Sequence, residues 1–94
     1  MHTPPSSEHL REEILYSRIR FIEVELDLGI TFCSIASTTD DADSRERNIA
    51  NARKASGTAA VALNGLTIPT GVSKRLHDKL SKLNLMLDGF QAGR

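Results

Sequence analysis

Few residues in this chain have the type and spacing that metal or acid–base chemistry needs. His9 and Glu12 stand about one helical turn apart and would offer two metal ligands on one face. A catalytic zinc site needs about three protein ligands and a structural site about four, and the sequence indicates no third ligand beside them. His77 and Asp78 are adjacent, so on a helix they point about 100° apart and cannot form an oriented pair. We interpret His9 and Glu12 as an exposed helical turn. A metal- or small-ligand-binding bundle, completed by groups from a partner chain, is the alternative.

Cys33 is the single cysteine of the chain, which excludes an intramolecular disulfide and a multi-cysteine zinc site. It falls on an apolar helical row with no basic residue on that face to lower the pKa of its thiol, so we predict an inert core residue. A reduced, cytoplasmic setting fits it best. We therefore expect no enzyme activity, no catalytic residue, no cofactor and no resident metal.

The charge balance and the hydropathy exclude two classes of partner. Twelve basic residues match twelve acidic ones, whereas duplex-binding modules usually carry a basic excess. Basic residues gathered on two segments are interpreted as solvated helix faces, which places nucleic-acid binding last among the functions considered. No stretch approaches the roughly 18–20 apolar residues of a membrane span, and the N-terminus lacks the pattern of a signal peptide. We expect neither a nucleic-acid nor a membrane partner.

The pattern of the chain predicts an all-α protein. Residues 1–6 are expected to be a disordered tail, residues 7–90 a single three-helix domain, and residues 91–94 a frayed end. The first helix is predicted over residues 7–37 from two neighbouring apolar rows. The first row, which together with the second forms one broad apolar stripe, is Leu10, Ile14, Phe21, Leu28, Phe32 and Ile35. The second row is Leu15, Ile22, Leu26, Cys33 and Ala36.

Residues 22–32 also alternate between apolar and polar, which is typical of a half-buried strand. We prefer a helix, because no partner strand is visible and a lone strand leaves its backbone unpaired. In a helix, Val24 and Ile30 fall outside the main apolar stripe, and at about 1.5 Å per residue the helix is long for so small a domain. Both observations predict that apolar side chains of the first helix extend beyond the other two helices, an overhang that a second subunit covers. The predicted interface residues are Tyr16, Val24 and Ile30.

Two further helices complete the domain. The second, over residues 41–64, has an inward face of small residues around Ala52 and Ser56; Gly57 is expected where the first helix crosses. Asp40, Asp41 or Asp43 caps its start, and Gly65 is expected to end it in a left-handed conformation.

The third helix, over residues 68–88, is defined by a regular apolar seam. Its members are Val72, Leu76, Leu80, Leu83 and Leu87. Gly89 is expected to stop this helix, with Phe90 folding back onto Leu85. Short connections make neighbouring helices antiparallel, so the predicted fold is a three-helix up-down-up bundle.

Residues 28–32, a Leu-Gly pair followed by an aromatic three residues after the glycine, resemble the first helix of tetratricopeptide repeats. Ala52, Ser56 and Ala59 match the spacing of that family's second helix, although Ser56 replaces an aromatic and Asn64 replaces the closing proline. The chain thus resembles one tetratricopeptide-like hairpin with a capping helix, and is similar in outline to microtubule-interacting-and-transport modules. The resemblance implies peptide or partner binding. A single unit has no stacked neighbours to form that family's concave groove.

Residues 51–57 also resemble the motif of phosphotransfer domains, but Asn51 stands where the phosphoacceptor histidine would be. Asparagine cannot form a phosphoramidate, so phosphotransfer is not expected. The function predicted from the sequence is a non-enzymatic helical protein–protein interaction module that associates with a protein partner or with itself as a homodimer.

Overall fold

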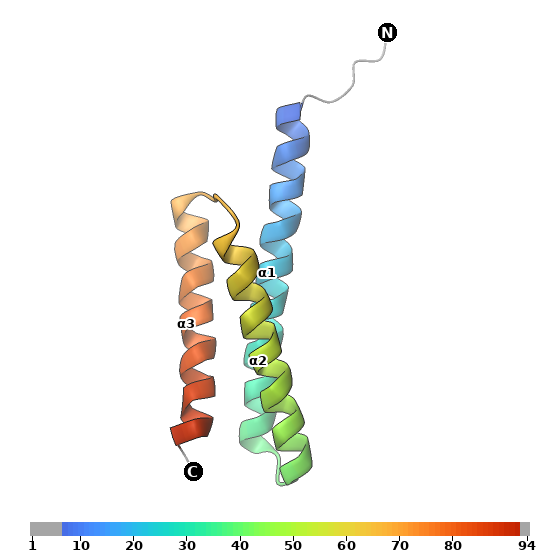
Figure 1. Ribbon diagram of the computed structural model, residues 1–94, viewed down its shortest axis with the longest axis vertical. Helices are drawn as coiled ribbons and strands as arrows, with labels where there is room; N and C mark the ends of the chain where they lie inside the picture. Colours follow the sequence, from blue (N-terminus) through green and yellow to red (C-terminus); the bar gives the residue numbers. More distant parts are fainter. Residues whose placement is uncertain (1–6, 93–94) are drawn as a thin grey trace.

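The computed structural model describes residues 7–92 and confirms the predicted fold class. Helix α1 spans Ser7–Thr38, α2 spans Ala42–Asn64 and α3 spans Thr70–Ala92. The connections 39–41 and 65–69 reverse the chain, so neighbouring helices run antiparallel (Figure 1). Residues 22–32 lie inside α1, so the helical interpretation of that segment is confirmed and the strand is ruled out. The tail predicted over residues 1–6 and the last residues of the predicted frayed end lie outside the described part.

The core uses the row of α1 that the sequence placed second. Ile22, Leu26 and Cys33 are completely buried, together with Leu76 and Leu83 of α3. The predicted stripe is therefore too broad: the second row is buried from Ile22 to Ala36, whereas in the first row only Phe32 packs against the core. The physical reason lies in side-chain size: the buried row also contains Gly29 and Ala36, whose small side chains let α2 and α3 approach α1 closely.

One glycine marks the close approach of the three helices. A Cβ atom built on Gly29 would lie 2.6 Å from Cδ2 of Leu83 in α3 and 3.4 Å from Cβ of Ala55 in α2. At Gly57, which the sequence predicted at the crossing, an added Cβ would meet no atom within 4 Å. The crossing prediction for Gly57 is therefore wrong, and Gly29 occupies that position.

The helix ends differ from the sequence prediction at two glycines. Gly65 has φ −87° and ψ 0°, a right-handed conformation, because its amide donates to the carbonyl of Leu63 in a tight turn. This turn leads into Leu66, which packs against the core. Gly89 does not stop α3. The helix continues to Ala92 because Phe90, which lies three residues after the buried Leu87, packs against the core. Leu85 stays exposed.

The cap at the start of α2 and the inward position of Ser56 agree with the sequence predictions. Asp41, one of the candidates, caps α2: its carboxylate accepts from the amides of Asp43 and Ser44, each at 3.3 Å. Ser56 faces inward as predicted. Its hydroxyl bonds to Oδ1 of Asn84 at 2.6 Å, which satisfies a polar group inside an otherwise apolar contact.

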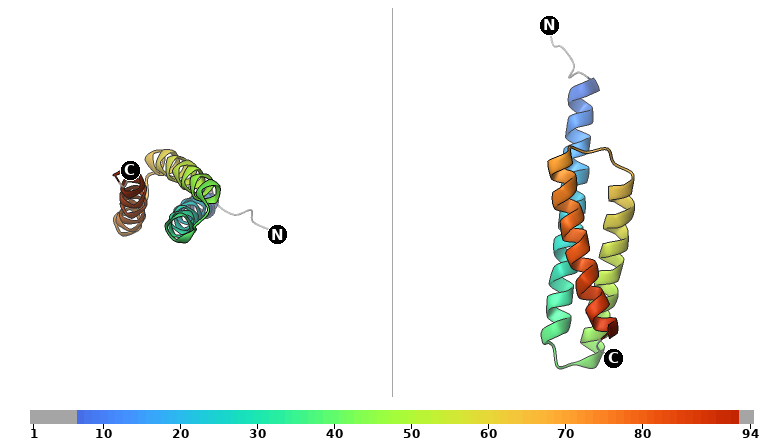
Figure 2. Two further views of the ribbon diagram at one scale, coloured as in Figure 1. Left: turned by 90° about the horizontal axis from the view of Figure 1, so that it is seen from below. Right: turned by 90° about the vertical axis from the view of Figure 1, so that its left-hand side faces the viewer.

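Helix α1 is longer than its neighbours and extends past them. It has 32 residues, against 23 in each of α2 and α3. Because α1 and α2 meet at their shared turn, the excess length projects at the N-terminal end of α1, beyond α2 and α3 (Figures 1 and 2). The overhang expected from the sequence is present.

Candidate protein-binding face

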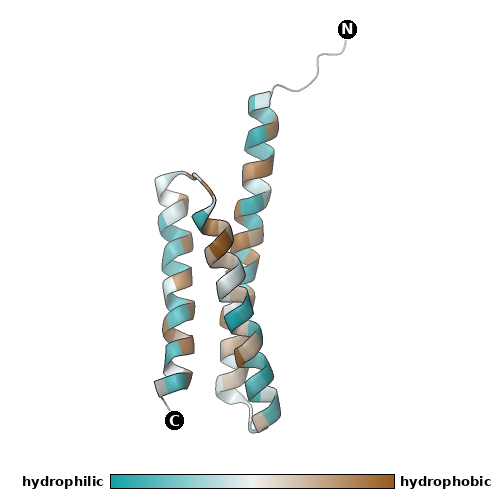
Figure 3. Ribbon diagram, in the orientation of Figure 1, coloured by the Kyte–Doolittle hydropathy of each residue, from teal (hydrophilic) through white to brown (hydrophobic). Residues whose placement is uncertain are grey.

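One side of α1, outside the buried core and bordering α2, carries a continuous series of large apolar side chains. We call this series the outer row. Its members are Leu10, Ile14, Phe21, Val24, Leu28 and Ile35. Each exposes between 41% and 55% of its surface, so none is an ordinary core residue. Figure 3 shows apolar positions recurring along the projecting part of α1 as well as along the packed part.

The spacing of the outer row is that of a coiled-coil seam. Ile14, Phe21, Leu28 and Ile35 follow one another at seven-residue intervals. Leu10 and Val24 fall four residues before Ile14 and Leu28, at the second apolar position of the same heptad. Ser17, Thr31 and Thr38 hold the remaining positions of that second series. The row therefore has the a and d pattern that seats one helix against another.

The outer row cannot be covered by the chain's own helices. At 3.6 residues per turn, its centre lies roughly 120° around α1 from the centre of the buried row. Helices α2 and α3 pack on the buried side, as the end-on view of Figure 2 shows. The apolar stripe consequently remains on the surface over the whole length of α1.

Phe21 connects the outer row with α2. It lines one shallow groove with Ala62 and Leu66 and a second one with Gly57 and Val61. Val61 exposes 76% of its surface, the largest fraction among the exposed large apolar side chains. The apolar surface therefore widens from α1 onto α2 at the middle of the row.

The structure places the three predicted interface residues in different surroundings. Val24 belongs to the outer row. Tyr16 is 62% exposed and lies on the projecting part of α1, beside the row and not in it. Ile30 packs against the core and so does not extend the exposed stripe. The sequence signal that identifies the rest of the row is its seven-residue repeat.

Charges of opposite sign flank the two halves of the outer row. Arg11, Glu13, Arg18 and Arg20 flank its N-terminal half, where Glu13 pairs with His9, and Glu25 and Asp27 flank its C-terminal half. In the described part of the chain, no ion pair or side-chain hydrogen bond engages Arg18, Arg20 or Glu25. Asp27 is bound on one oxygen by Lys79 and stays 57% exposed. These flanking charges are available to a partner.

Helices α1 and α3 are joined beside the row by a cluster of ion pairs. Lys79 Nζ lies 2.9 Å from Asp27 Oδ1 and 3.2 Å from Glu23 Oε2, and Arg75 Nε lies 3.3 Å from the same Glu23 oxygen. The hydrogen bonds to Asp27 and Glu23 raise the pKa of Lys79 above its ordinary value, although partial burial opposes them. The cluster holds α3 on the flank of α1.

This cluster predicts a loss of stability at alkaline pH. Because the pKa of Lys79 is raised in the folded chain, its protonated form stabilises the fold. This contribution to the free energy of unfolding is complete below the unfolded pKa of about 10.4 and disappears as the pH rises through the pKa of the folded chain. We expect the free energy of unfolding, measured by urea denaturation, to fall more steeply above about pH 10 in the native chain than in Lys79→Gln. Lys82→Gln is the control and should keep the native slope. Equal slopes for the native chain and Lys79→Gln would contradict the assignment.

The residues considered for metal or thiol chemistry do not form a site. His9 pairs with Glu13, at 3.1 Å, on the exposed start of α1. Within residues 7–92, no group of three or more His, Cys, Asp and Glu side chains is arranged to hold a metal ion. Cys33 is completely buried, and burial raises the pKa of its thiol. His77 is exposed on α3.

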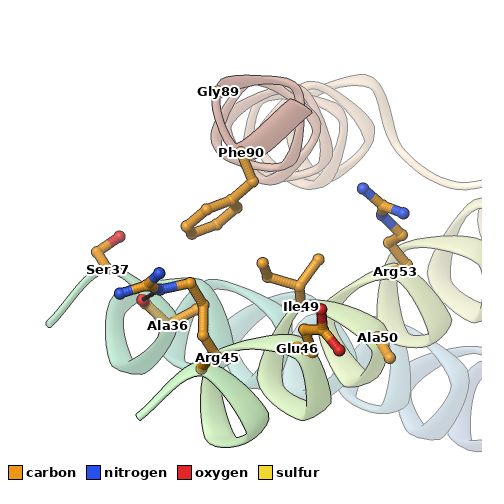
Figure 4. A pocket seen from close by; sticks show the side chains of 10 residues that line it. Ala36, Ser37, Arg45, Glu46, Ile49, Ala50, Arg53, Gly89 and Phe90 are labelled. Carbon is orange, nitrogen blue, oxygen red and sulfur yellow. Dashed lines mark hydrogen bonds between the residues drawn. The ribbon is translucent and has the colours of Figure 1, made fainter. Parts of the chain in front are cut away.

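A hollow of about 780 Å³ opens between the end of α3 and the α1–α2 turn. Phe90 reaches into it toward Ile49, and Arg45 and Arg53 stand on either side (Figure 4). Arg45 is occupied, because its guanidinium donates to the carbonyls of Ala36 at 3.3 Å and Thr39 at 3.0 Å and so ties α2 to the end of α1. The hollow offers no buried polar atom without a partner among the described residues, so it has no evident ligand chemistry.

The outer row is therefore the feature of the described chain that best fits a functional surface. None of the three helices has a stretch long and apolar enough to cross a membrane. No protein-family model, no curated protein and no solved structure matches this chain.

Proposed function

We propose that this chain is a non-enzymatic protein–protein interaction module whose binding surface is the outer row of α1. The observation that carries the proposal is the series of half-exposed apolar side chains at heptad spacing along the whole helix. A continuous apolar stripe rimmed by charges is the usual sign of an interaction surface, whereas scattered apolar side chains need no explanation.

The partner that fits the row is an amphipathic α-helix. Side chains at a and d positions insert between four residues of a facing helix, which suits the alternation of large residues such as Phe21 with the small Ser17. Covering the exposed apolar area would contribute about 25 cal/mol per Å² before the cost of association is subtracted. The charged flanks would set the orientation of the bound helix. A single buried thiol, Cys33, suits a reduced, cytoplasmic setting.

The test is a titration of the isotope-labelled chain with a synthetic heptad helix that carries leucine at a and d, acidic residues at the flanks of one half and basic residues at the flanks of the other. We expect amide chemical-shift changes along α1, centred on Phe21 and Leu28. Phe21→Ser combined with Leu28→Ser should abolish binding without unfolding the chain, because both side chains are half exposed. Leu85→Ser, at a 71% exposed leucine on α3, is the matched control and should bind normally. Shift changes confined to α3, or equal loss in the control, would refute the proposal.

A further inference from the structure

We propose that the helix bound by the outer row is α1 of a second copy of this chain, lying antiparallel in one register. This inference rests on the proposed function of the row and names its partner. The carrying observation is that the charges flanking the middle of the row change sign, from arginine at 18 and 20 to acidic residues at 25 and 27. In an antiparallel pair of identical helices, the arginines of each helix therefore lie opposite the acidic residues of the other.

The complement is specific to one alignment. In an antiparallel pair, each a position faces a d position of the partner, each e position faces an e position, and each g position faces a g position. Here Arg18 and Glu25 are e positions, and Arg20 and Asp27 are g positions. With Phe21 opposite Val24 of the partner subunit, Arg18 faces the partner's Glu25 and Arg20 faces the partner's Asp27. Two-fold symmetry forms each of these pairs twice. Neither arginine, nor Glu25, is engaged within the described part of its own chain.

Other antiparallel alignments bring like charges together. A shift of one heptad in one direction places Arg18 and Arg20 opposite themselves. A shift in the other direction places Glu25 and Asp27 opposite themselves. Like charges in facing flank positions are unfavourable by about as much as opposite charges are favourable. The flanks therefore select the alignment centred on Phe21 and Val24.

The selected alignment also matches the ends of the helix. It sets Ser7 opposite Thr38 of the partner subunit, which are the first and last residues of α1, so that the outer rows overlap over their full length. Leu28 then faces the partner's Ser17. The projecting end of each α1 lies beside the three-helix part of the other copy, and the exposed stripe has no uncovered remainder.

A parallel pair is the competing arrangement. It also joins opposite charges, through Glu13 with the partner's Arg18 and Arg20 with the partner's Glu25. It leaves Asp27 without a basic partner, sets Ser17 against the partner's Ser17, and aligns the two helix dipoles, whose like ends repel. The antiparallel pair leaves Glu13 without a basic partner, but it gives Asp27 one, sets Ser17 against the partner's Leu28 and opposes the two dipoles. A charge-swap experiment distinguishes the two arrangements.

The experiment measures the dissociation constant of the dimer by sedimentation equilibrium of the full chain, whose monomer has a mass of 10.3 kDa. Arg18→Glu and Glu25→Arg are each expected to weaken the dimer roughly tenfold, because each turns attractive pairs into repulsive ones. The two substitutions combined in one chain should restore native affinity, and so should an equimolar mixture of the two single variants. Lys82→Glu on α3 controls for the change in net charge and should leave the dimer intact.

The outcomes are distinct. A combined variant that is weaker than either single variant indicates the parallel pair and overturns the register. A native chain that stays monomeric at several hundred micromolar overturns the second copy as partner; if it still binds the synthetic helix through the row, the proposed function stands. A dimer that survives Phe21→Ser with Leu28→Ser overturns the use of the row itself. Circular dichroism of each variant confirms that the helices are retained.

Discussion

Leu26→Ala is expected to lower the free energy of unfolding by about 3 kcal/mol, whereas Leu28→Ala is expected to change it by less than about 1 kcal/mol. The two leucines lie two residues apart in α1, and only the first is buried: Leu26 is 0% exposed and Leu28 is 43% exposed. Removing Leu26 leaves a cavity between α1 and its neighbours that the packed core cannot fill. Removing Leu28 shortens a side chain that already borders solvent.

The comparison is made by urea denaturation in the Arg18→Glu background, at a protein concentration where sedimentation shows only monomer, so that a contribution of Leu28 to self-association does not enter. Leu26→Ala should lower the denaturation midpoint with little change in slope. Similar losses for the two variants would mean that the outer row is packed inside the chain, and the proposed binding surface would then be wrong. A larger loss for Leu28→Ala would contradict the burial of both residues.

The helices of this fold are predictable from local sequence, because periodic apolar residues and capping groups act within a few turns. The helix chosen over a strand at residues 22–32 is confirmed, and the predicted ends of α1 and α2 agree with the structure to within a residue. Asp41 was among the predicted caps. At the end of α3 the local signal fails: Gly89 reads as a stop, but the contact of Phe90 with the core extends the helix.

Which of the two apolar rows of α1 is buried cannot be predicted from the sequence of α1 alone. Both rows repeat at helical spacing, and the row with the larger side chains looks like the better core. The structure buries the other row because Gly29 and Ala36 permit a close approach, which depends on what α2 and α3 present to α1. The candidate site follows from this reversal. Its residues were visible in the sequence, but all except Val24 were included in the broad predicted stripe.

Gly29→Val is expected to destabilise the chain by about 2–3 kcal/mol, because it overfills the point where the three helices meet. The new Cβ would lie 2.6 Å from one δ-carbon of Leu83 and 3.2 Å from the other. Leu83 is completely buried, so its side chain has no open space to move into and α3 must shift outward. The gain in helix propensity from removing a glycine, about 0.5 kcal/mol, offsets only part of this cost.

Gly57→Val is the matched control, since an added Cβ there meets no atom within 4 Å. It should change the free energy of unfolding by no more than about 0.5 kcal/mol, and the change should be stabilising if helix propensity alone acts. Equal effects at the two glycines would show that conformational freedom, not space, explains the Gly29 result.

A double-mutant cycle tests whether the side chain added at position 29 clashes with Leu83. Leu83→Ala alone should cost about 2–5 kcal/mol, the usual range for a buried leucine. In the Gly29→Val background the same change removes the clashing δ-carbons, so it should cost less by at least about 1 kcal/mol. Additive effects would place the conflict on Ala55 of α2 instead. Coupling to Leu83 would show that a glycine in α1 fixes how closely α3 packs, and therefore which face of α1 remains outside.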